Sequence, residues 1–346
     1  MSTRGLAALH AGKNLTPFSF DRRTPNTNDI DFSVSFAGIC HSDIHQVREE
    51  WGPALFPMVP GHEIVGIVDR VGSDVSGFKP GDKIGVGVFV DSCRSCAQCV
   101  NGLEQYCAEG MTPTYNGYER DGKTISFGGY SNRFVIDQKY ALHVPDSLEF
   151  SGVAPLLCAG ITLYSPLRFW KTDSKTKVAI MGLGGLGHLG LKFAKAMGAH
   201  VTVLSHSAKK EQDARAMGAD DFINTSDEAA MLAAEKRFDL ILNTVSAELN
   251  INDFLKQLSL NGTLVCIGLP GKPYSVNVGS LLEARRSLAG SMIGGIKETQ
   301  EMLNFAAEHG IVSEVEVIDA NYVNTAYERT VASDVRYRFV IDAKTF

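Results

Sequence analysis

Residues 177–187 read Lys-Val-Ala-Ile-Met-Gly-Leu-Gly-Gly-Leu-Gly, an apolar run that ends in a glycine-rich turn. A helical pattern of apolar residues follows from Leu186 to Met197. Glycines placed between a strand and a helix in this way let the backbone approach the pyrophosphate of a dinucleotide. The start of the helix supplies N–H donors to the same phosphates. The motif therefore predicts a dinucleotide site at Gly182, Gly184, Gly185 and Gly187, although a tight turn without ligand would use similar glycines.

The segments after this turn alternate between strand and helix. Apolar runs predict strands, and a longer periodic segment predicts a helix between two of them. Alternation at this spacing is typical of a parallel sheet covered by helices, the doubly wound Rossmann arrangement of α/β proteins. We place this domain at 152–293, with strands expected at His200–Leu204, Phe238–Leu242 and Thr263–Ile267 and a helix at Lys209–Met217.

Residues 1–151 instead show strand patterns separated by glycine and proline. Ile30–Phe36 alternates between apolar and polar residues, whereas Glu63–Val68 and Lys83–Phe89 are almost continuously apolar. We expect a small twisted β-barrel with long loops. Residues 294–346 are predicted to return to this domain through a helix at Lys297–His309 and a strand at Arg338–Ile341.

The composition and net charge of the chain limit the kinds of molecule that it is expected to bind. The chain has 346 residues, is 44% hydrophobic and 21% charged, and carries a net charge of −6. The absence of a basic run argues against nucleic acid and anionic membranes as partners. The first residues lack the apolar core of a signal peptide, and no later apolar run is long enough to span a bilayer. We therefore expect a cytoplasmic protein, in which cysteines serve as metal ligands or buried thiols.

Four cysteines lie within 15 residues, with spacing Cys-x2-Cys-x2-Cys-x7-Cys. Pairs two residues apart bend around one ion, and four thiolates complete a tetrahedral zinc site that is closed to substrate. Two disulfides or four buried thiols are the alternatives. We predict a structural zinc lobe at about 91–108, held by Cys93, Cys96, Cys99 and Cys107.

Cys40, His62 and Cys158 remain as possible ligands of a second ion. Three protein ligands leave a zinc ion with an open position for substrate. Any one of these residues alone is more often a packed core residue, and Cys266, within an apolar run, is interpreted as core. Glu63 follows His62 directly and is placed to enter the metal shell transiently. Asp43 is a plausible acceptor for the second N–H of the ligand imidazole.

The second strand of the dinucleotide domain indicates which cofactor binds. NAD sites carry an acidic residue there to hold the ribose 2′-hydroxyl. Here the sequence is Ser205-His206-Ser207-Ala208-Lys209-Lys210, without a carboxylate. Hydroxyl and ammonium groups suit the additional phosphate of NADP. We therefore predict NADP(H) bound by Ser205, Ser207 and Lys210, the alternative being a solvated turn that starts a helix.

Together these motifs make the chain similar to the zinc-containing medium-chain alcohol dehydrogenases, and within them to the cinnamyl alcohol dehydrogenase-like branch. The resemblance extends from end to end. It implies a GroES-like catalytic domain, a Rossmann domain, an active site in the cleft between them, and a homodimer joined through the Rossmann sheets. Besides the four-cysteine lobe, the segments that carry it are Ala37–Asp43, Pro60–Glu63, Leu157–Thr162, Gly182–Gly187 and Asp334–Phe339.

The resemblance also implies residue roles. Cys40, His62 and Cys158 would hold the catalytic zinc, with Glu63 beside them, so that each subunit binds two Zn2+ ions. Ser42 would pass the proton of the alcohol towards His45 by way of the cofactor ribose. His41 stands where many relatives have an arginine that contacts the pyrophosphate. The other residues assigned to the cofactor are Thr162, near the nicotinamide, and Leu186, Thr244, Gly268 and Arg336.

The predicted reaction is reversible hydride transfer between NADPH and an aromatic or medium-chain aldehyde. The alternatives are an NAD-dependent polyol dehydrogenase of the same fold, a zinc-free quinone reductase, and a non-catalytic protein that binds zinc and cofactor. Zinc-free relatives lack the two cysteines and the histidine, which argues against the quinone reductase. The candidate walls of the substrate pocket are Trp51, Phe56, Phe89 and Leu269.

Overall fold

Six parallel strands form one sheet, as the glycine-rich turn and the alternating pattern predict. Numbered along the chain, the strands lie side by side in the order 3-2-1-4-5-6, which is typical of doubly wound sheets. In spatial order the strands are β14 (Asp221–Asn224), β13 (His200–Ser205), β12 (Lys177–Met181), β15 (Phe238–Asn243), β16 (Leu258–Cys266) and β17 (Ser287–Gly290). The sequence patterns missed β14 and β17, the two short strands at the edges.

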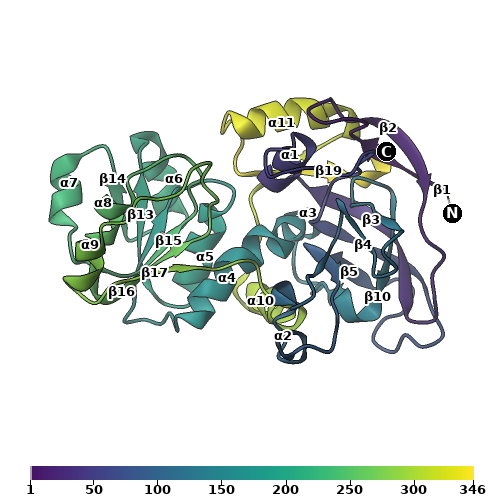
Figure 1. The fold of residues 1–346 in the computed structure, drawn as a ribbon, viewed down its shortest axis with the longest axis horizontal. Helices are drawn as coiled ribbons and strands as arrows, with labels where there is room; N and C mark the ends of the chain where they lie inside the picture. Colours follow the sequence, from purple (N-terminus) through teal and green to yellow (C-terminus); the bar gives the residue numbers. More distant parts are fainter. Residues whose placement is uncertain (1) are drawn as a thin grey trace. The chain divides into compact units, whose positions relative to one another are not determined.

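Helices cover this sheet (Figure 1). The helix after the glycine-rich turn contacts the two strands that precede and follow it, and the shorter helices contact the strands nearer the edges. Their bounds are α4 (Ala159–Phe169), α5 (Gly187–Ala196), α6 (Glu211–Ala216), α7 (Glu228–Ala233), α8 (Ile251–Leu255) and α9 (Val278–Leu282). The predicted helix at Lys209–Met217 is divided into a 3-10 turn at Ala208–Lys210 and α6.

A second, mixed sheet forms the other part of the protein. Its strands are mostly antiparallel, but the last two along the path run parallel. Their order is β11 (Leu142–His143), β5 (Lys83–Val86), β4 (Ile64–Val71), β3 (Asp29–Gly38), β19 (Arg338–Asp342) and β18 (Val315–Ile318), with β10 (Arg133–Asp137) also paired to β3. Among the described residues 2–346, the edge strands β11 and β18 do not pair with each other. The hydrogen bonds between strands therefore do not close this sheet into the predicted barrel.

The apolar run at Lys83–Phe89 is two strands rather than one. β5 pairs with β4, whereas β6 (Phe89–Asp91) pairs with β7 (Thr112–Pro113) in a separate ribbon. The run breaks at Gly87, where a Cβ atom would lie 2.9 Å from the carbonyl oxygen of Leu157. Phe89 is buried with its ring against Tyr140, so it is part of the core and not a wall of a pocket.

The end of the chain returns to this second part, as Figure 1 shows in yellow beside the purple N-terminal strands. Val323 and Tyr327 of the last helix share a core cluster with Leu6 near the start of the chain. The elements outside the two large sheets are β1 (Ser2–Ala7), β2 (Thr16–Asp21), α1 (His41–Val47), α2 (Ala97–Val100), β8 (Gly117–Tyr118), β9 (Ile125–Ser126), α3 (Phe150–Val153), α10 (Ile296–His309) and α11 (Val323–Val331).

These elements belong to a computed structural model that describes residues 2–346 and divides into two units. Unit 1 combines the chain up to Ile161 with Gly294–Phe346, and unit 2 is Thr162–Ile293. The boundary between Ile161 and Thr162 lies further along the chain than the change in sequence pattern at 151–152. The reason is that the 3-10 turn at Ala154–Leu157 contacts the strands β3, β4 and β5 of unit 1.

No single helix within residues 2–346 has the length and apolar character needed to cross a bilayer. One pair of segments, Phe150–Leu157 and Ala159–Phe169, passes that test only when taken together, and it is bent by 59°.

Candidate active site and cofactor site

Helix α1 positions the first group of functional side chains. It starts after Cys40, and the carboxylate of Asp43 accepts the backbone N–H of Cys40 at 2.9 Å, which ties down the first turn of the helix. Asp43 and Ile44 face the core. Ser42 and His45 are three residues apart, which makes them neighbours on one side of the helix. Ser42 Oγ lies 3.5 Å from Cys40 Sγ.

Four potential metal ligands converge in unit 1. One ligand atom from each of Cys40, His62, Glu63 and Cys158 lies within 4.8 Å of the other three. Cys40 lies between β3 and α1, His62 and Glu63 lie just before β4, and Cys158 follows the 3-10 turn that leads into α4. Three chain segments that are far apart in sequence therefore meet at one point. Two thiols, an imidazole and a carboxylate are donors that suit zinc.

Glu63 is fully buried, and its two oxygens have different surroundings. Oε1 pairs with the guanidinium of Arg338, which comes from β19. Oε2 has no hydrogen-bond partner among the described residues. Burial raises the pKa of Glu63 to about 7, and the charge of Arg338 opposes that rise. An unsatisfied buried carboxylate oxygen within this cluster fits a site for a cation.

The imidazole of His62 is fixed through its Nδ1, which lies 3.1 Å from an oxygen of Asp43. This contact leaves the other ring nitrogen for a metal, which is the common arrangement of zinc-bound histidines. A hydrogen bond with Cys158, together with the contact to His62, holds the pKa of Cys40 well below the usual value for a thiol, although burial opposes this. The lowered pKa favours the thiolate form of Cys40, which is the form that binds a metal.

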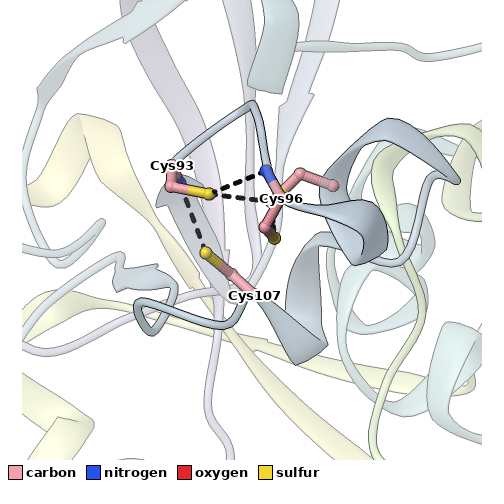
Figure 2. Close-up of side chains that lie close together, drawn as sticks. Cys93, Cys96 and Cys107 are labelled. Carbon is pink, nitrogen blue, oxygen red and sulfur yellow. Dashed lines mark hydrogen bonds between the residues drawn. The ribbon is translucent and has the colours of Figure 1, made fainter.

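The four-cysteine segment forms a loop closed on its own sulfur atoms (Figure 2). The backbone N–H of Cys93 donates to Cys107 Sγ, and that of Cys96 donates to Cys93 Sγ, each at 3.3 Å. The sulfurs of Cys93 and Cys99 are 3.8 Å apart, and those of Cys96 and Cys99 are 3.4 Å apart. Sulfurs around a tetrahedral zinc with bonds of about 2.3 Å lie about 3.8 Å apart. The loop therefore fits the predicted structural zinc.

His45 has a partner that the sequence patterns did not reveal. Its Nδ1 is hydrogen-bonded to the carboxylate of Glu50, and its ring stacks on Trp51 with 4.7 Å between centroids. Glu50 lies beyond the end of α1, so helical spacing does not connect it with His45. Trp51, a proposed pocket residue, is 45% exposed, whereas Phe56 packs on the core of unit 1.

In unit 2, the predicted cofactor residues gather at the carboxyl ends of β12, β13 and β15. Gly182 has a φ of +88°, and a Cβ on Gly187 would lie 1.9 Å from the carbonyl oxygen of Gly182, so the turn accepts only glycine at these places. The turn passes through Gly184, Gly185 and Leu186 into α5. At Gly184 a Cβ would meet no atom within 4 Å, which leaves space for a phosphate.

Polar groups surround this turn. Lys210 Nζ donates to the carbonyl oxygen of Leu183 at 2.5 Å, and the N–H of Ser207 donates to Ser205 Oγ at 3.2 Å. After β15, Thr244 Oγ1 donates to the carbonyl oxygen of Met181 at 2.8 Å. A Cβ on Gly268 would approach the carbonyl oxygen of Val245 to 2.5 Å. Lys210 and Thr244 thus contact the turn or the end of the strand before it, whereas Ser205 and Ser207 contact each other and Gly268 packs against the segment that holds Thr244.

The other predicted cofactor residues lie elsewhere. His41 is the exposed first residue of α1, and Arg336 is exposed just before β19, both in unit 1. Thr162 is buried in α4 at the start of unit 2.

The chain is similar to known proteins over almost its whole length. Residues 26–146 match the model of the alcohol dehydrogenase GroES-like domain, and residues 185–308 match that of the zinc-binding dehydrogenases. NADP-dependent alcohol dehydrogenase C 1 of Mycolicibacterium smegmatis is 56% identical over 97% of this chain and 96% of its own. Aldehyde reductase YahK of Escherichia coli is 49% identical over 100% of this chain and 99% of its own. The cinnamyl alcohol dehydrogenase SbCAD4 of Sorghum bicolor has a TM-score of 0.96 and 43% identity over 99% of this chain and 98% of its own. The chain belongs to the zinc-binding alcohol dehydrogenase family.

The dehydrogenase carries one further buried charge at its ligand cluster. Arg338 is 5% exposed and donates to Glu63, which is 275 positions away in the sequence. The sequence patterns placed Arg338 in a strand but gave it no role. Its partner became visible only through the pairing of β19 with β3, which brings the end of the chain beside Gly38.

We expect Arg338→Met to destabilise the dehydrogenase by about 3–5 kcal/mol, because the carboxylate of Glu63 would remain buried without its partner. The double variant Glu63→Gln with Arg338→Met removes both charges and should recover most of the loss. Urea unfolding of the three proteins measures the difference. An unchanged midpoint for Arg338→Met alone would contradict this account of the ion pair.

Proposed function

We propose that the protein is a zinc-dependent NADP(H) alcohol dehydrogenase that interconverts an aldehyde and a primary alcohol. The convergence of Cys40, His62, Glu63 and Cys158 carries this proposal, because these donors suit a zinc ion that keeps a position open for substrate. Relatives named NADP-dependent alcohol dehydrogenase and aldehyde reductase, matched over almost the whole chain, support it. In cells NADPH usually favours reduction, so the aldehyde is the proposed substrate.

Bound zinc supplies a Lewis acid for the substrate oxygen, and NADPH supplies the hydride. Cys40, His62 and Cys158 hold the ion, and Glu63 stands beside them. Ser42 is close to Cys40 and exchanges a proton with the reacting oxygen. His45, in the last turn of α1, and Glu50, just beyond the helix, carry that proton to solvent.

We propose two zinc ions per subunit, which the two separate donor sets support. The thiolates of Cys93, Cys96, Cys99 and Cys107 hold the second ion without an open position. Its role is to fix the lobe, because the segment between β6 and β7 contains little regular structure besides the one-turn helix α2 and a 3-10 turn at Glu104–Tyr106.

For the cofactor, we propose that Ser205, Ser207 and Lys210 contact the 2′-phosphate of NADP(H). Lys210 lies beside the glycine-rich turn, at the side where the ribose of a bound dinucleotide is expected. The proposed substrate is an aromatic or medium-chain aldehyde. The structural similarity to a cinnamyl alcohol dehydrogenase and the half-exposed ring of Trp51 favour it.

We also propose a cytoplasmic homodimer. Within the described residues, β17 is the last strand of the six-stranded sheet and pairs only with β16. Its free edge offers backbone donors and acceptors to the same edge of a second copy. Exposed apolar residues near this end of the unit, Val278 and Leu282, suit such an interface.

The experiment that tests the proposed function is NADPH oxidation by the purified enzyme with a panel of aromatic and aliphatic aldehydes, together with elemental analysis. We expect turnover and two zinc ions per chain. Cys99→Ala should lose one zinc, whereas Cys266→Ala should keep both. Activity on polyols with NAD instead, or a single zinc confined to the lobe, would contradict the proposal.

Lys210→Ala is expected to raise the Michaelis constant for NADPH about 10-fold to 100-fold and to change that for NADH little. The lost contact is a charged hydrogen bond to phosphate, which is worth about 1.5–3 kcal/mol. Steady-state kinetics with both cofactors measure the effect, and Lys209→Ala, whose side chain is exposed, is the matched control. Equal effects of Lys210→Ala on both cofactors would end the assignment.

Ser42→Ala should lower kcat about 100-fold to 10,000-fold, because the hydroxyl that exchanges a proton with the substrate is removed. Zinc content should stay normal, since Ser42 is not among the proposed ligands. Ser42→Thr retains a hydroxyl and should keep most of the turnover. If Ser42→Ala kept its turnover, the proposed proton path would be wrong.

A further inference from the structure

Asp43 is a fully buried carboxylate that receives several hydrogen bonds. Its Oδ2 accepts from the backbone N–H of Cys40 at 2.9 Å and from the hydroxyl of Tyr130 at 3.0 Å. Its Oδ1 accepts from the backbone N–H of Gly61 at 3.2 Å and lies 3.1 Å from His62 Nδ1. Each oxygen thus has two of these partners, and the buried hydroxyl of Tyr115 also makes a hydrogen bond to the carboxylate. The orientation of the carboxylate, and with it the direction in which His62 is held, depends on these contacts together.

Tyr130 is the member of this group that belongs to none of the ligand segments. It lies in the loop between β9 and β10 and has no exposed surface. Its backbone N–H donates to the carbonyl oxygen of Pro60 at 2.9 Å. Its ring lies directly against Gly61, where a Cβ would approach ring atom Cδ1 to 2.5 Å. Tyr130 therefore contacts both Asp43 and the turn that leads into His62.

A second phenol provides a comparison. Tyr327 of α11 is also buried, with its ring edge-on to Tyr130 at 6.5 Å between centroids. Its hydroxyl lies near that of Tyr130 but is not a donor to Asp43. The two tyrosines thus share the same core, but of the two only Tyr130 donates to Asp43. Removing each hydroxyl in turn separates the hydrogen bond from the packing of the ring.

We propose that Tyr130 is a positioning residue for the catalytic metal site. Its hydroxyl fixes the Asp43 carboxylate, which in turn holds the imidazole of His62 towards Cys40 and Cys158. The inference rests on the proposed function, because it assigns Tyr130 a role at the zinc that this function requires. Without the hydroxyl, Oδ2 loses a side-chain donor, the carboxylate gains freedom to turn, and His62 becomes a looser ligand.

The test is zinc release from the purified holoenzyme into a colorimetric chelator, for the unchanged protein, Tyr130→Phe and Tyr327→Phe. Two zinc ions should leave in separable phases, so that the four-cysteine lobe serves as an internal reference. We expect Tyr130→Phe to speed the release from the Cys40–His62–Cys158 site about 10-fold and to leave the lobe phase unchanged. Tyr327→Phe should leave both phases unchanged.

A parallel measurement separates positioning from general stability. In Tyr130→Phe, urea unfolding should show a midpoint lowered only by the loss of one buried hydrogen bond, and kinetics should show an unchanged Michaelis constant for NADPH with a lowered kcat. Equal release rates in all three proteins would overturn the proposal, as would equal acceleration of both phases with a lowered midpoint. If the unchanged enzyme held zinc only in the lobe, or had no NADPH-dependent activity, the proposed function itself would fail, which is a distinct outcome.

Discussion

The burial of the Asp43 carboxylate is the constraint on which the ligand cluster depends. A buried charge is costly unless its oxygens are satisfied. Here the donors come from the start of α1, from the turn before β4 and from the loop before β10. A shift of any of these segments would cost the buried carboxylate at least one of its hydrogen bonds. The geometry of Cys40 and His62 is therefore a property of the folded core and not of either loop.

A second buried interaction joins the end of the chain to the same cluster. Arg338 reaches Glu63 because β19 pairs with β3 in the register that sets Val340 opposite Gly38. Gly38 lies so close to Glu63 that a Cβ there would approach Oε2 to 2.0 Å. The return of the last segment to unit 1 thus supplies a positive charge beside two thiols and a carboxylate. This charge would offset the negative charge of these ligands on binding the proposed zinc.

The two proposed zinc-binding sets differ in how they are built. The four cysteines of the lobe lie within one short segment, and backbone N–H groups of that segment donate to their sulfurs. Such a site forms wherever the local loop can close. The set of Cys40, His62 and Cys158 instead needs β3, β4 and the 3-10 turn to assemble first. This contrast suits the two proposed roles, one ion holding a loop and the other kept at a site defined by the whole unit.

The sequence by itself determined the features whose signals are local. The glycines around Gly182, the spacing from Cys93 to Cys107 and the apolar strands predicted the parallel sheet, the lobe and the donor types, because turns and closely spaced ligands depend on neighbouring residues. Only the tertiary structure decided that Glu50 pairs with His45, that Arg338 pairs with Glu63 and that Tyr130 holds Asp43. Strand register and core packing create these contacts, so they cannot be predicted from periodic patterns in the sequence. The same reason explains why the edge strands β14 and β17 escaped notice: they are short, and only pairing with their neighbours makes them strands.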